Sequence, residues 1–189
     1  MGKIDDLADA YERHIAGPWQ HTLAGAQRVV FVVYDKEVER SLRARMADFQ
    51  QRTERSHHGW IQCDCTRLFA DWMAADDYRD AYFEEPDDLR LKLEGEFQEH
   101  VAAQMRRHLR SGDRERDKNT VVALTGLGSL YPFAHISLLI RALEPDIEGR
   151  LVVFFPGSKN GNNYRFLDAR DGFHYLGASI TMTGLDGAA

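Results

Sequence analysis

Short apolar runs alternate with amphipathic stretches along this chain, and the alternation predicts an α/β fold. The runs are rich in β-branched residues and have the length of strands covered on both faces; they lie at residues 28–35, 59–65, 119–126 and 149–157. Between them, apolar residues recur at helical spacing, which predicts helices over 4–17, 36–55, 67–77, 86–109 and 132–145. The sequence therefore predicts a Rossmann-like three-layer sandwich, with a mostly parallel sheet of four to five strands and one long helix.

The longest predicted helix runs from Pro86 to Leu109 and has an unusual apolar spacing. Every fourth residue is apolar, in the series Leu89, Leu93, Phe97, Val101, Met105 and Leu109. A regular α-helix turns about 400° in four residues, so this stripe should wind around the helix by about 40° per step. Either the helix packs on its own domain and curves around it, or it offers part of the stripe to another molecule.

The end of the chain reads as short elements followed by a tail. A short strand is expected at residues 164–168 and a last strand or turn at 171–177, while residues 184–189 are expected to fray. Residues 1–183 then form a single domain, which suits the length of 189 residues and the apolar fraction of 43%.

Charge and hydropathy argue against a nucleic-acid-binding protein of high positive charge, a membrane protein and a secreted protein. The net charge of -6 disfavours binding of nucleic acid through the overall field and leaves only a local patch or an indirect contact. The apolar runs are too short to cross a bilayer, and the first residues lack the basic-then-apolar plan of a signal peptide. We therefore expect no membrane contact and a cytoplasmic location.

The two cysteines, Cys63 and Cys65, have two interpretations. On a predicted strand they are core thiols, which suits a reducing compartment. With His57 and His58 they would form a metal site, but their spacing is not the usual one for zinc. The first interpretation is favoured, so neither a metal nor a cofactor is expected.

A glycine-containing turn follows the third predicted strand, at the sheet edge where α/β proteins bind ligands. Gly126, Gly128 and Ser129 stand between this strand and the next helix, so exposed amides and a helix N-terminus could meet an anion there. The turn lacks the lysine of a P-loop, and Tyr131 stands where a dinucleotide fingerprint needs a third glycine. A structural turn beside a recognition surface is favoured over a phosphate site, and His135 could reach the same surface.

A polar loop over residues 156–172 is the second candidate. Its amides, cations and carboxylates could bind a ligand, a peptide or a phosphodiester, or could only tie down the last elements; they include Asn162, Arg165, Asp168, Arg170 and Asp171. Asp35 and Asp64, at strand ends taken as adjacent, could hold Mg²⁺ for a hydrolase, although capping of the next helix is the better interpretation for Asp35. No catalytic set can be assembled from the sequence.

Two motifs make the chain resemble the BrxB family of bacterial BREX phage-defence systems, over about residues 5–180. They are G-x-G-S-L-Y-P-F, from Gly126 to Phe133, and P-G-x-x-x-x-N-x-Y-R-x-L-D-x-R-D-G, from Pro156 to Gly172. In the family an arginine often stands two residues after the Phe133 position, where this chain has His135.

The resemblance implies a role more than a reaction. BrxB-like proteins are small members without established catalysis, and they look like assembly subunits that dock on the alkaline-phosphatase-like component, PglZ. We therefore expect a non-catalytic adaptor that binds other BREX components; the alternative is a nucleotide- or nucleic-acid-binding subunit that uses the glycine turn. The residues expected to bind a partner or ligand are Gly126, Gly128, Ser129, Tyr131, His135, Asn162, Tyr164, Arg165, Asp168 and Arg170.

Overall fold

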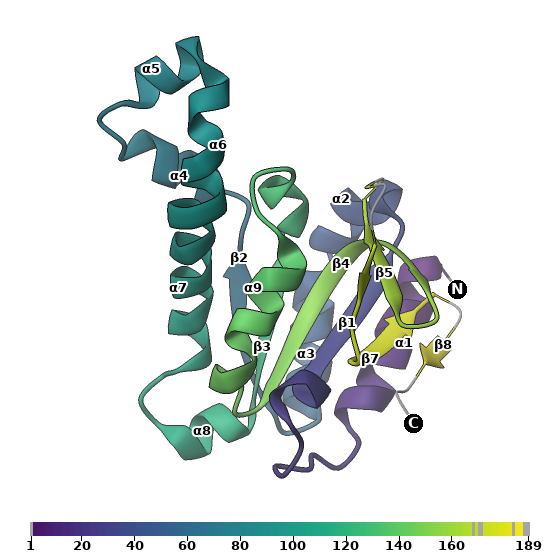
Figure 1. The fold of residues 1–189 in the computed structure, drawn as a ribbon. Coiled ribbons are helices and arrows are strands. Elements are labelled where there is room, and N and C mark those ends of the chain that lie inside the picture. Colours follow the sequence, from purple (N-terminus) through teal and green to yellow (C-terminus); the bar gives the residue numbers. More distant parts are fainter. Residues whose placement is uncertain (1, 168, 170–171, 183, 187–189) are drawn as a thin grey trace.

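A central sheet organises the protein in the computed structural model, which describes residues 2–167, 169, 172–182 and 184–186. Five strands run parallel in the order β2-β3-β4-β1-β7, as predicted for a Rossmann-like sandwich (Figure 1). β8 adds to β7 antiparallel, and β5 and β6 form an antiparallel extension of β4. The strands are β1 (Val29–Tyr34), β2 (Gly59–Asp64), β3 (Thr120–Thr125), β4 (Arg150–Asn160), β5 (Asn163–Phe166), β6 (Phe173–His174), β7 (Ala178–Thr181) and β8 (Gly184–Asp186).

Helices cover both faces of the sheet. The α-helices are α1 (Lys3–Ile15), α2 (Glu39–Arg43), α3 (Met46–Arg55), α4 (Leu68–Ala74), α5 (Arg79–Glu84), α6 (Arg90–Lys92), α7 (Gln98–Leu109), α8 (Arg114–Lys118) and α9 (Ile136–Leu143). Short 3₁₀ turns are η1 (Gly25–Arg28), η2 (Lys36–Val38), η3 (Pro86–Leu89), η5 (Leu127–Leu130) and η6 (Glu144–Asp146), and η4 (Leu93–Phe97) is a π-helix. None of the helices described is long and apolar enough to span a membrane.

The continuous apolar run of β1 shows why a sheet with two covered faces forms. All six of its residues are buried. Phe31 belongs to the core beneath α7 and α9, whereas the next residue, Val32, belongs to the core beneath α1 and α3. Because side chains alternate across a strand, only a strand covered on both faces buries every position.

The long helical segment predicted over 86–109 contains one irregular turn that the sequence did not reveal. The segment passes through η3 and α6 into the π-helix Leu93–Phe97 and then into α7. A π turn holds one more residue than an α turn, so it offsets part of the 40° drift of the four-residue spacing. Leu93 is half-buried, and the other residues of the stripe are buried, namely Leu89, Phe97, Val101, Met105 and Leu109.

The stripe therefore packs within the protein itself. From Phe97 onward its members belong to the core shared with β2, β3 and α9, and they are not available to a partner. The hypothesis that the winding stripe offers a docking surface is wrong, because the protein's own side chains already cover it.

Residues 66–97, which connect β2 to α7, form a helical arm. The arm extends beyond the end of the sheet toward which β2 points, so it stands beside the carboxyl ends of the parallel strands (Figure 1). Its base is fixed by aromatic contacts: Phe69 stacks on Phe133 with ring centroids 3.8 Å apart, and Trp72 lies 5.0 Å from Phe97. The predicted helix over 67–77 is thus the first part of a larger projection.

The chain between β4 and its end differs from the prediction. β4 continues past the expected end at Gly157 and turns into the β5 hairpin, since Gly157 pairs with Phe166. The parallel strand β7 was not predicted, and the expected frayed tail from residue 184 is wrong for Gly184–Asp186, which pair with β7. The helix predicted over 36–55 is divided into η2, α2 and α3, although its apolar residues Leu42, Met46 and Phe49 are buried as expected.

Candidate functional site

The carboxyl ends of β1, β2 and β3 do not bring the predicted carboxylates together. The order β2-β3-β4-β1 separates Asp64, at the end of β2, from Asp35, after β1, by two intervening strands. Three spacings of about 4.8 Å place them about 14 Å apart. A Mg²⁺ ion shared between Asp35 and Asp64 is therefore excluded by the topology, and the expectation of adjacent strand ends was wrong.

Each carboxylate instead stabilises its own loop. Asp35 is the N-cap of η2 and accepts a hydrogen bond from the amide of Glu37 at 3.1 Å, which confirms capping. Asp64 accepts hydrogen bonds from the amide of Thr66 at 3.0 Å and from its hydroxyl, and pairs with Arg43 at 3.2 Å. Across the described residues, no group of three or more His, Cys, Asp or Glu could hold a metal ion.

The two cysteines lie in the core, as the favoured interpretation predicted. Cys63 and Cys65 are free and 2% and 0% exposed. The hydrogen bond to Cys63 and burial both raise the pKa of the Cys65 thiol. His58 precedes the other end of β2, about 16 Å away at 3.3 Å per residue, and stacks on Trp19. The histidines and cysteines therefore form no common site.

The glycine turn after β3 is built around a left-handed residue. Gly126 is buried with φ 69°, and it leads into the four-residue turn η5. A Cβ at Gly126 would lie 2.5 Å from the Thr66 hydroxyl and 2.7 Å from an Asp64 carboxylate oxygen. Glycine is therefore required by both backbone conformation and space, which supports the interpretation of a structural turn.

Two observations argue against a phosphate at this turn. The Asp64 carboxylate lies against Gly126, so a phosphate at this point of the turn would meet a negative charge. The helix after the strand, α9, begins only at Ile136, ten residues beyond Gly126, so its N-terminus is not part of the turn. The helix predicted to begin at Pro132 therefore begins four residues later, and η5 and residues 131–135 separate Gly126 from its first residue.

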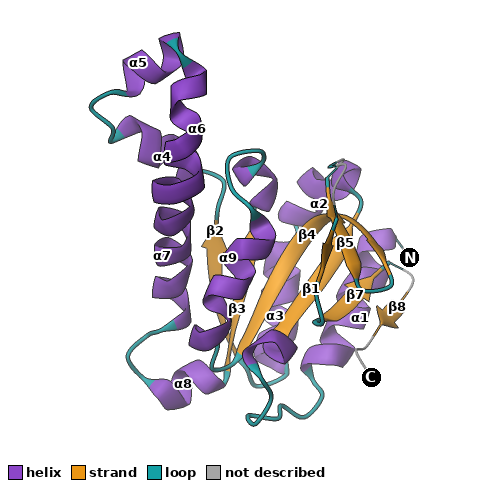
Figure 2. Cartoon of the chain, in the orientation of Figure 1, coloured by secondary structure: helices purple, strands orange, loops and turns teal. Residues whose placement is uncertain are grey.

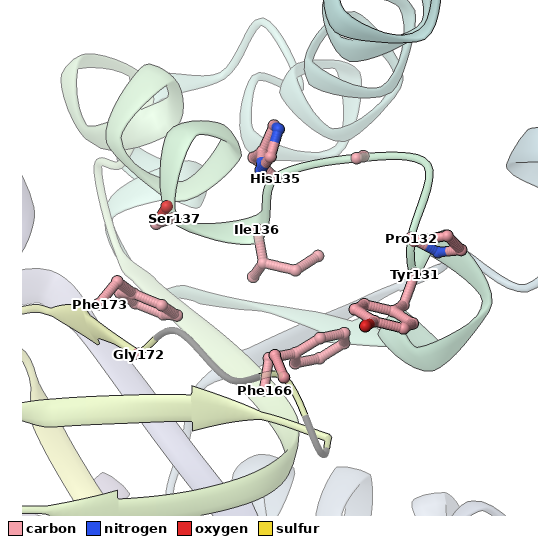
Figure 3. Close-up of a pocket in the computed structure, with 10 residues that line it drawn as sticks. Tyr131, Pro132, His135, Ile136, Ser137, Phe166, Gly172 and Phe173 are labelled. Atoms are coloured by element: carbon pink, nitrogen blue, oxygen red, sulfur yellow. The ribbon is translucent and has the colours of Figure 1, made fainter. Parts of the chain in front are cut away.

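A hollow of about 650 Å³ lies beside this segment, between the residues before α9 and the β5–β6 connection (Figure 3). Tyr131, 46% exposed, stands on one side, and its ring lies 6.2 Å from that of Phe166. Ile136 and Phe173 line the apolar wall. This hollow, which we call the Tyr131 hollow, is an open recess of mixed polar and apolar lining with an aromatic residue at its rim.

His135 lines the same hollow, but its imidazole is turned away from the rings of Tyr131 and Phe166 (Figure 3). Its backbone is fixed to the long helix: the amide donates to Gln98 Oε1 at 2.9 Å, and the carbonyl accepts from Gln98 Nε2 at 3.1 Å. The side chain is exposed and free of the apolar wall. His135 therefore shapes the rim of the hollow through its backbone.

A second depression, of about 340 Å³, lies where the chains leaving β1 and β4 diverge. The chain after β1 passes to the α2 and α3 side, whereas β4 turns into β5 on the other side, which is the arrangement that forms a crevice in α/β sheets (Figure 1). The crevice is lined by Asp35, Lys36, Gly157, Ser158, Arg165 and Leu167. Alternation along β5 thus places Arg165 at this crevice and Phe166 in the Tyr131 hollow.

The remaining predicted site residues separate into different places. Tyr164 is fully buried among Phe31, Phe155 and Phe173, so its prediction as a partner-binding residue is wrong. Gly126 is buried, whereas Gly128 and Ser129 reach the surface, as does Asn162 in the hairpin turn. Asp168, Arg170 and Asp171 lie outside the described residues.

The sequence reasoning missed the apolar wall of the hollow. Phe166 belongs to the loop that was interpreted as polar, and Phe173 to the segment 171–177 that was expected to be a last strand or turn; both have exposed neighbours in β5 and β6. Period-two alternation in NYRF was the available signal, but four residues are too few to make it strong.

We expect ATP, GTP, NAD and short oligonucleotides to leave the melting temperature unchanged, because the glycine turn faces a carboxylate. A ligand present at a hundredfold excess over its Kd would add about 2.7 kcal/mol of stability. For a chain of this size that is a rise of about 5 °C or more. Differential scanning fluorimetry with each compound measures it, and such a rise would restore the nucleotide-binding alternative.

A comparison with protein families bears on this surface. A family model described as BREX protein BrxB matches residues 62–179, more than half of the 189-residue chain. The matched region runs from β2 to β7 and includes the helical arm, the glycine turn and the Tyr131 hollow. Comparisons with curated proteins and with solved structures found no match.

Proposed function

Because this chain belongs to the BrxB family, and is therefore a component of the BREX phage-defence systems, we propose that it is a non-catalytic assembly subunit. Its partners are other BREX components, and the one on which we propose that it docks is the alkaline-phosphatase-like PglZ. Its docking surface is the carboxyl edge of the sheet, around the Tyr131 hollow and Arg165.

The observation that carries this proposal is the exposed aromatic ring at the rim of an open hollow with an apolar wall. Tyr131 is 46% exposed, and the wall beside it includes Ile136 and Phe166. Arg165 lies one residue away from that wall and is exposed on the other side of β5. Tyrosine and arginine are enriched among the residues that dominate protein interfaces, and an apolar recess gives a partner side chain a place to bury.

The use of the strand-end carboxylates supports a binding role over catalysis. Asp35 is occupied by the amide of Glu37, and Asp64 by Thr66 and Arg43. The two carboxylates therefore stabilise loops and are not directed at a common point. A surface without converging catalytic groups is suited to recognising a partner by shape and charge.

We expect purified protein and the PglZ-like component to form a stoichiometric complex in size-exclusion chromatography with light scattering. Tyr131→Ala and Arg165→Glu should each weaken the complex by about tenfold or more, because each alters the proposed contact surface. Arg114→Glu is the matched control: Arg114 is 75% exposed but lies on α8, at the opposite edge of the sheet (Figure 1).

Circular dichroism should show the same fold and a similar melting temperature for the three variants, since all the substituted side chains are exposed and the ion pair that Arg114→Glu removes, with Glu148, lies at the surface. If the Tyr131→Ala and Arg165→Glu variants bind PglZ as tightly as the wild-type chain does, the proposed docking surface is wrong. Failure of the wild-type chain to bind PglZ would contradict the proposed partner. Charge reversal at Arg170, which lies outside the described residues, should also weaken the complex if the loop over residues 156–172 contacts the partner.

A further inference from the structure

The tip of the helical arm displays large apolar side chains to solvent. Six large hydrophobic residues are well exposed among those that the structure describes, and three of them lie on the arm. Tyr78 is 71% exposed, Phe83 68% and Leu91 76%. Tyr78 directly precedes α5, Phe83 lies on α5 and Leu91 on α6, and these two helices stand clear of the sheet (Figure 2). A concentration of exposed apolar residues on one projection marks a surface for association.

The tip is held in a defined shape by one lysine. Lys92, only 20% exposed, forms an ion pair with Asp76, which is 9% exposed. Its ammonium group also lies 5.4 Å from the ring centroid of Tyr82 and 5.8 Å from that of Trp72. The hydrogen bond from Lys92 lowers the pKa of Asp76, so the pair stays charged well below neutral pH. The apolar side chains are therefore presented on an ordered scaffold, which reduces the entropy lost on binding.

The same tip carries the chain's excess negative charge. Residues 76–96 contain nine carboxylates and three cations, a net charge of −6, which equals the formal net charge of the whole chain. The remainder of the chain is therefore balanced. Six carboxylates are exposed and form no ion pair within the part of the chain that the structure describes, namely Asp77, Glu84, Glu85, Asp87, Asp88 and Glu94.

We propose that the arm tip docks on a basic surface of another BREX protein, one with an apolar recess that receives Phe83 and its exposed neighbours. Charge complementarity selects this occupant. Nucleic acid and anionic lipid would both be repelled by the tip, and two copies of the tip would repel each other. Only a positively charged protein surface satisfies the carboxylates and the apolar side chains together.

This docking surface is separate from the Tyr131 hollow. The exposed residues of the tip lie on α5, α6 and the turns that flank them, whereas the hollow is formed by the residues before α9 and by β5 and β6. The arm proposal therefore does not require that the hollow bind PglZ. The chain would then contact the defence complex through two surfaces, one at the sheet edge and one on the arm.

Site-specific crosslinking identifies the protein that covers the tip. The full chain, with Phe83 replaced by the photoreactive p-benzoylphenylalanine, is co-expressed with the other BREX components and irradiated. Mass spectrometry of the product should give one BREX protein, joined through a peptide from a surface rich in lysine and arginine. The same replacement at Leu176, which is 57% exposed on the body of the protein, is the control.

Binding measurements with the crosslinked component then separate the contribution of the apolar side chains from that of the carboxylates. The variant Tyr78→Ser/Phe83→Ser/Leu91→Ser should lower its affinity by about tenfold or more, and so should Glu84→Gln/Glu85→Gln/Asp87→Asn/Asp88→Asn. The second variant should also reduce the loss of affinity with added salt, because it removes the charges that salt screens. Leu176→Ser should bind like the wild-type chain.

Three results would overturn the proposal: a crosslink to a second copy of this chain, a crosslink to a surface without basic residues, or no crosslink to any BREX protein. Unchanged affinity in both tip variants would also overturn it. Should the apolar variant melt at a lower temperature, the four-residue amide variant decides alone, since its substituted side chains are all exposed and unpaired among the described residues.

Discussion

Replacing Phe97 by alanine should lower the free energy of unfolding by about 3–5 kcal/mol, the usual cost of deleting a buried phenylalanine ring. Phe97 is fully buried at the end of the π-helix and contacts Phe69 and Trp72 at the base of the arm. Its removal leaves a cavity at the point where the arm meets the core. Urea unfolding followed by circular dichroism measures the loss, and the expected fall in melting temperature is about 10 °C.

Phe83→Ala is the matched control for this experiment, because it deletes the same ring from a position that is 68% exposed. It should change the stability by no more than about 0.5 kcal/mol. Similar stability in Phe97→Ala and wild type would mean that the base of the arm is not part of the cooperative core. In that case the arm would unfold independently of the sheet.

The glycine turn gives the second large effect. Gly126→Ala should destabilise the protein by about 2–3 kcal/mol, since alanine costs about 1–2 kcal/mol at a left-handed position and its Cβ also displaces the Asp64 and Thr66 side chains. Asp64 then loses hydrogen bonds that hold the start of the arm. The measurement is again the free energy of unfolding in urea.

Gly128→Ala separates this effect from a general intolerance of the turn. A Cβ at Gly128 meets nothing within 4 Å, and its φ is not in the left-handed region. The variant should be as stable as the wild type or more stable by up to about 1 kcal/mol, because alanine restricts the unfolded chain. Equal destabilisation by the two variants would contradict the assignment of Gly126 as the position that requires glycine.

The α/β architecture could be predicted because the strands of the central sheet are buried on both faces. Runs such as VVFVVY and TVVALT have no polar face, and this property is typical of strands within a covered parallel sheet. The short strands β7 and β8 escaped prediction for the opposite reason. Ser179 and Thr181 interrupt the apolar pattern of β7, and its position next to β1 depends on a long-range contact that no local pattern encodes.

The candidate site was predicted in part. The rule that ligands bind at the carboxyl edge located the Tyr131 hollow and Arg165, but it could not give the order of the strands, so Asp35 and Asp64 were expected together. Tyr164 and Arg165 are neighbours in sequence but lie on opposite sides of β5. Tyr164 is therefore a core residue and Arg165 a surface residue. The exposed tip of the arm was missed because an exposed apolar residue at helical spacing looks the same as a buried one.

The π-helix Leu93–Phe97 has one more consequence, for the way related sequences can vary. A π turn amounts to one residue inserted into an α-helix, so deleting a residue there, such as the exposed Gly95, would restore regular winding. The part of the arm that directly precedes this turn, η3 and α6, would then rotate by about 100° around the helix axis and move by about 1.5 Å along it, while α4 stays fixed to the core through Phe69 and Phe133. The apolar and acidic tip would face another direction while the sheet and the Tyr131 hollow stayed as they are. One inserted residue therefore determines the direction in which the tip faces. Loss or gain of that residue would redirect the tip to a different partner without any change in the composition of the tip.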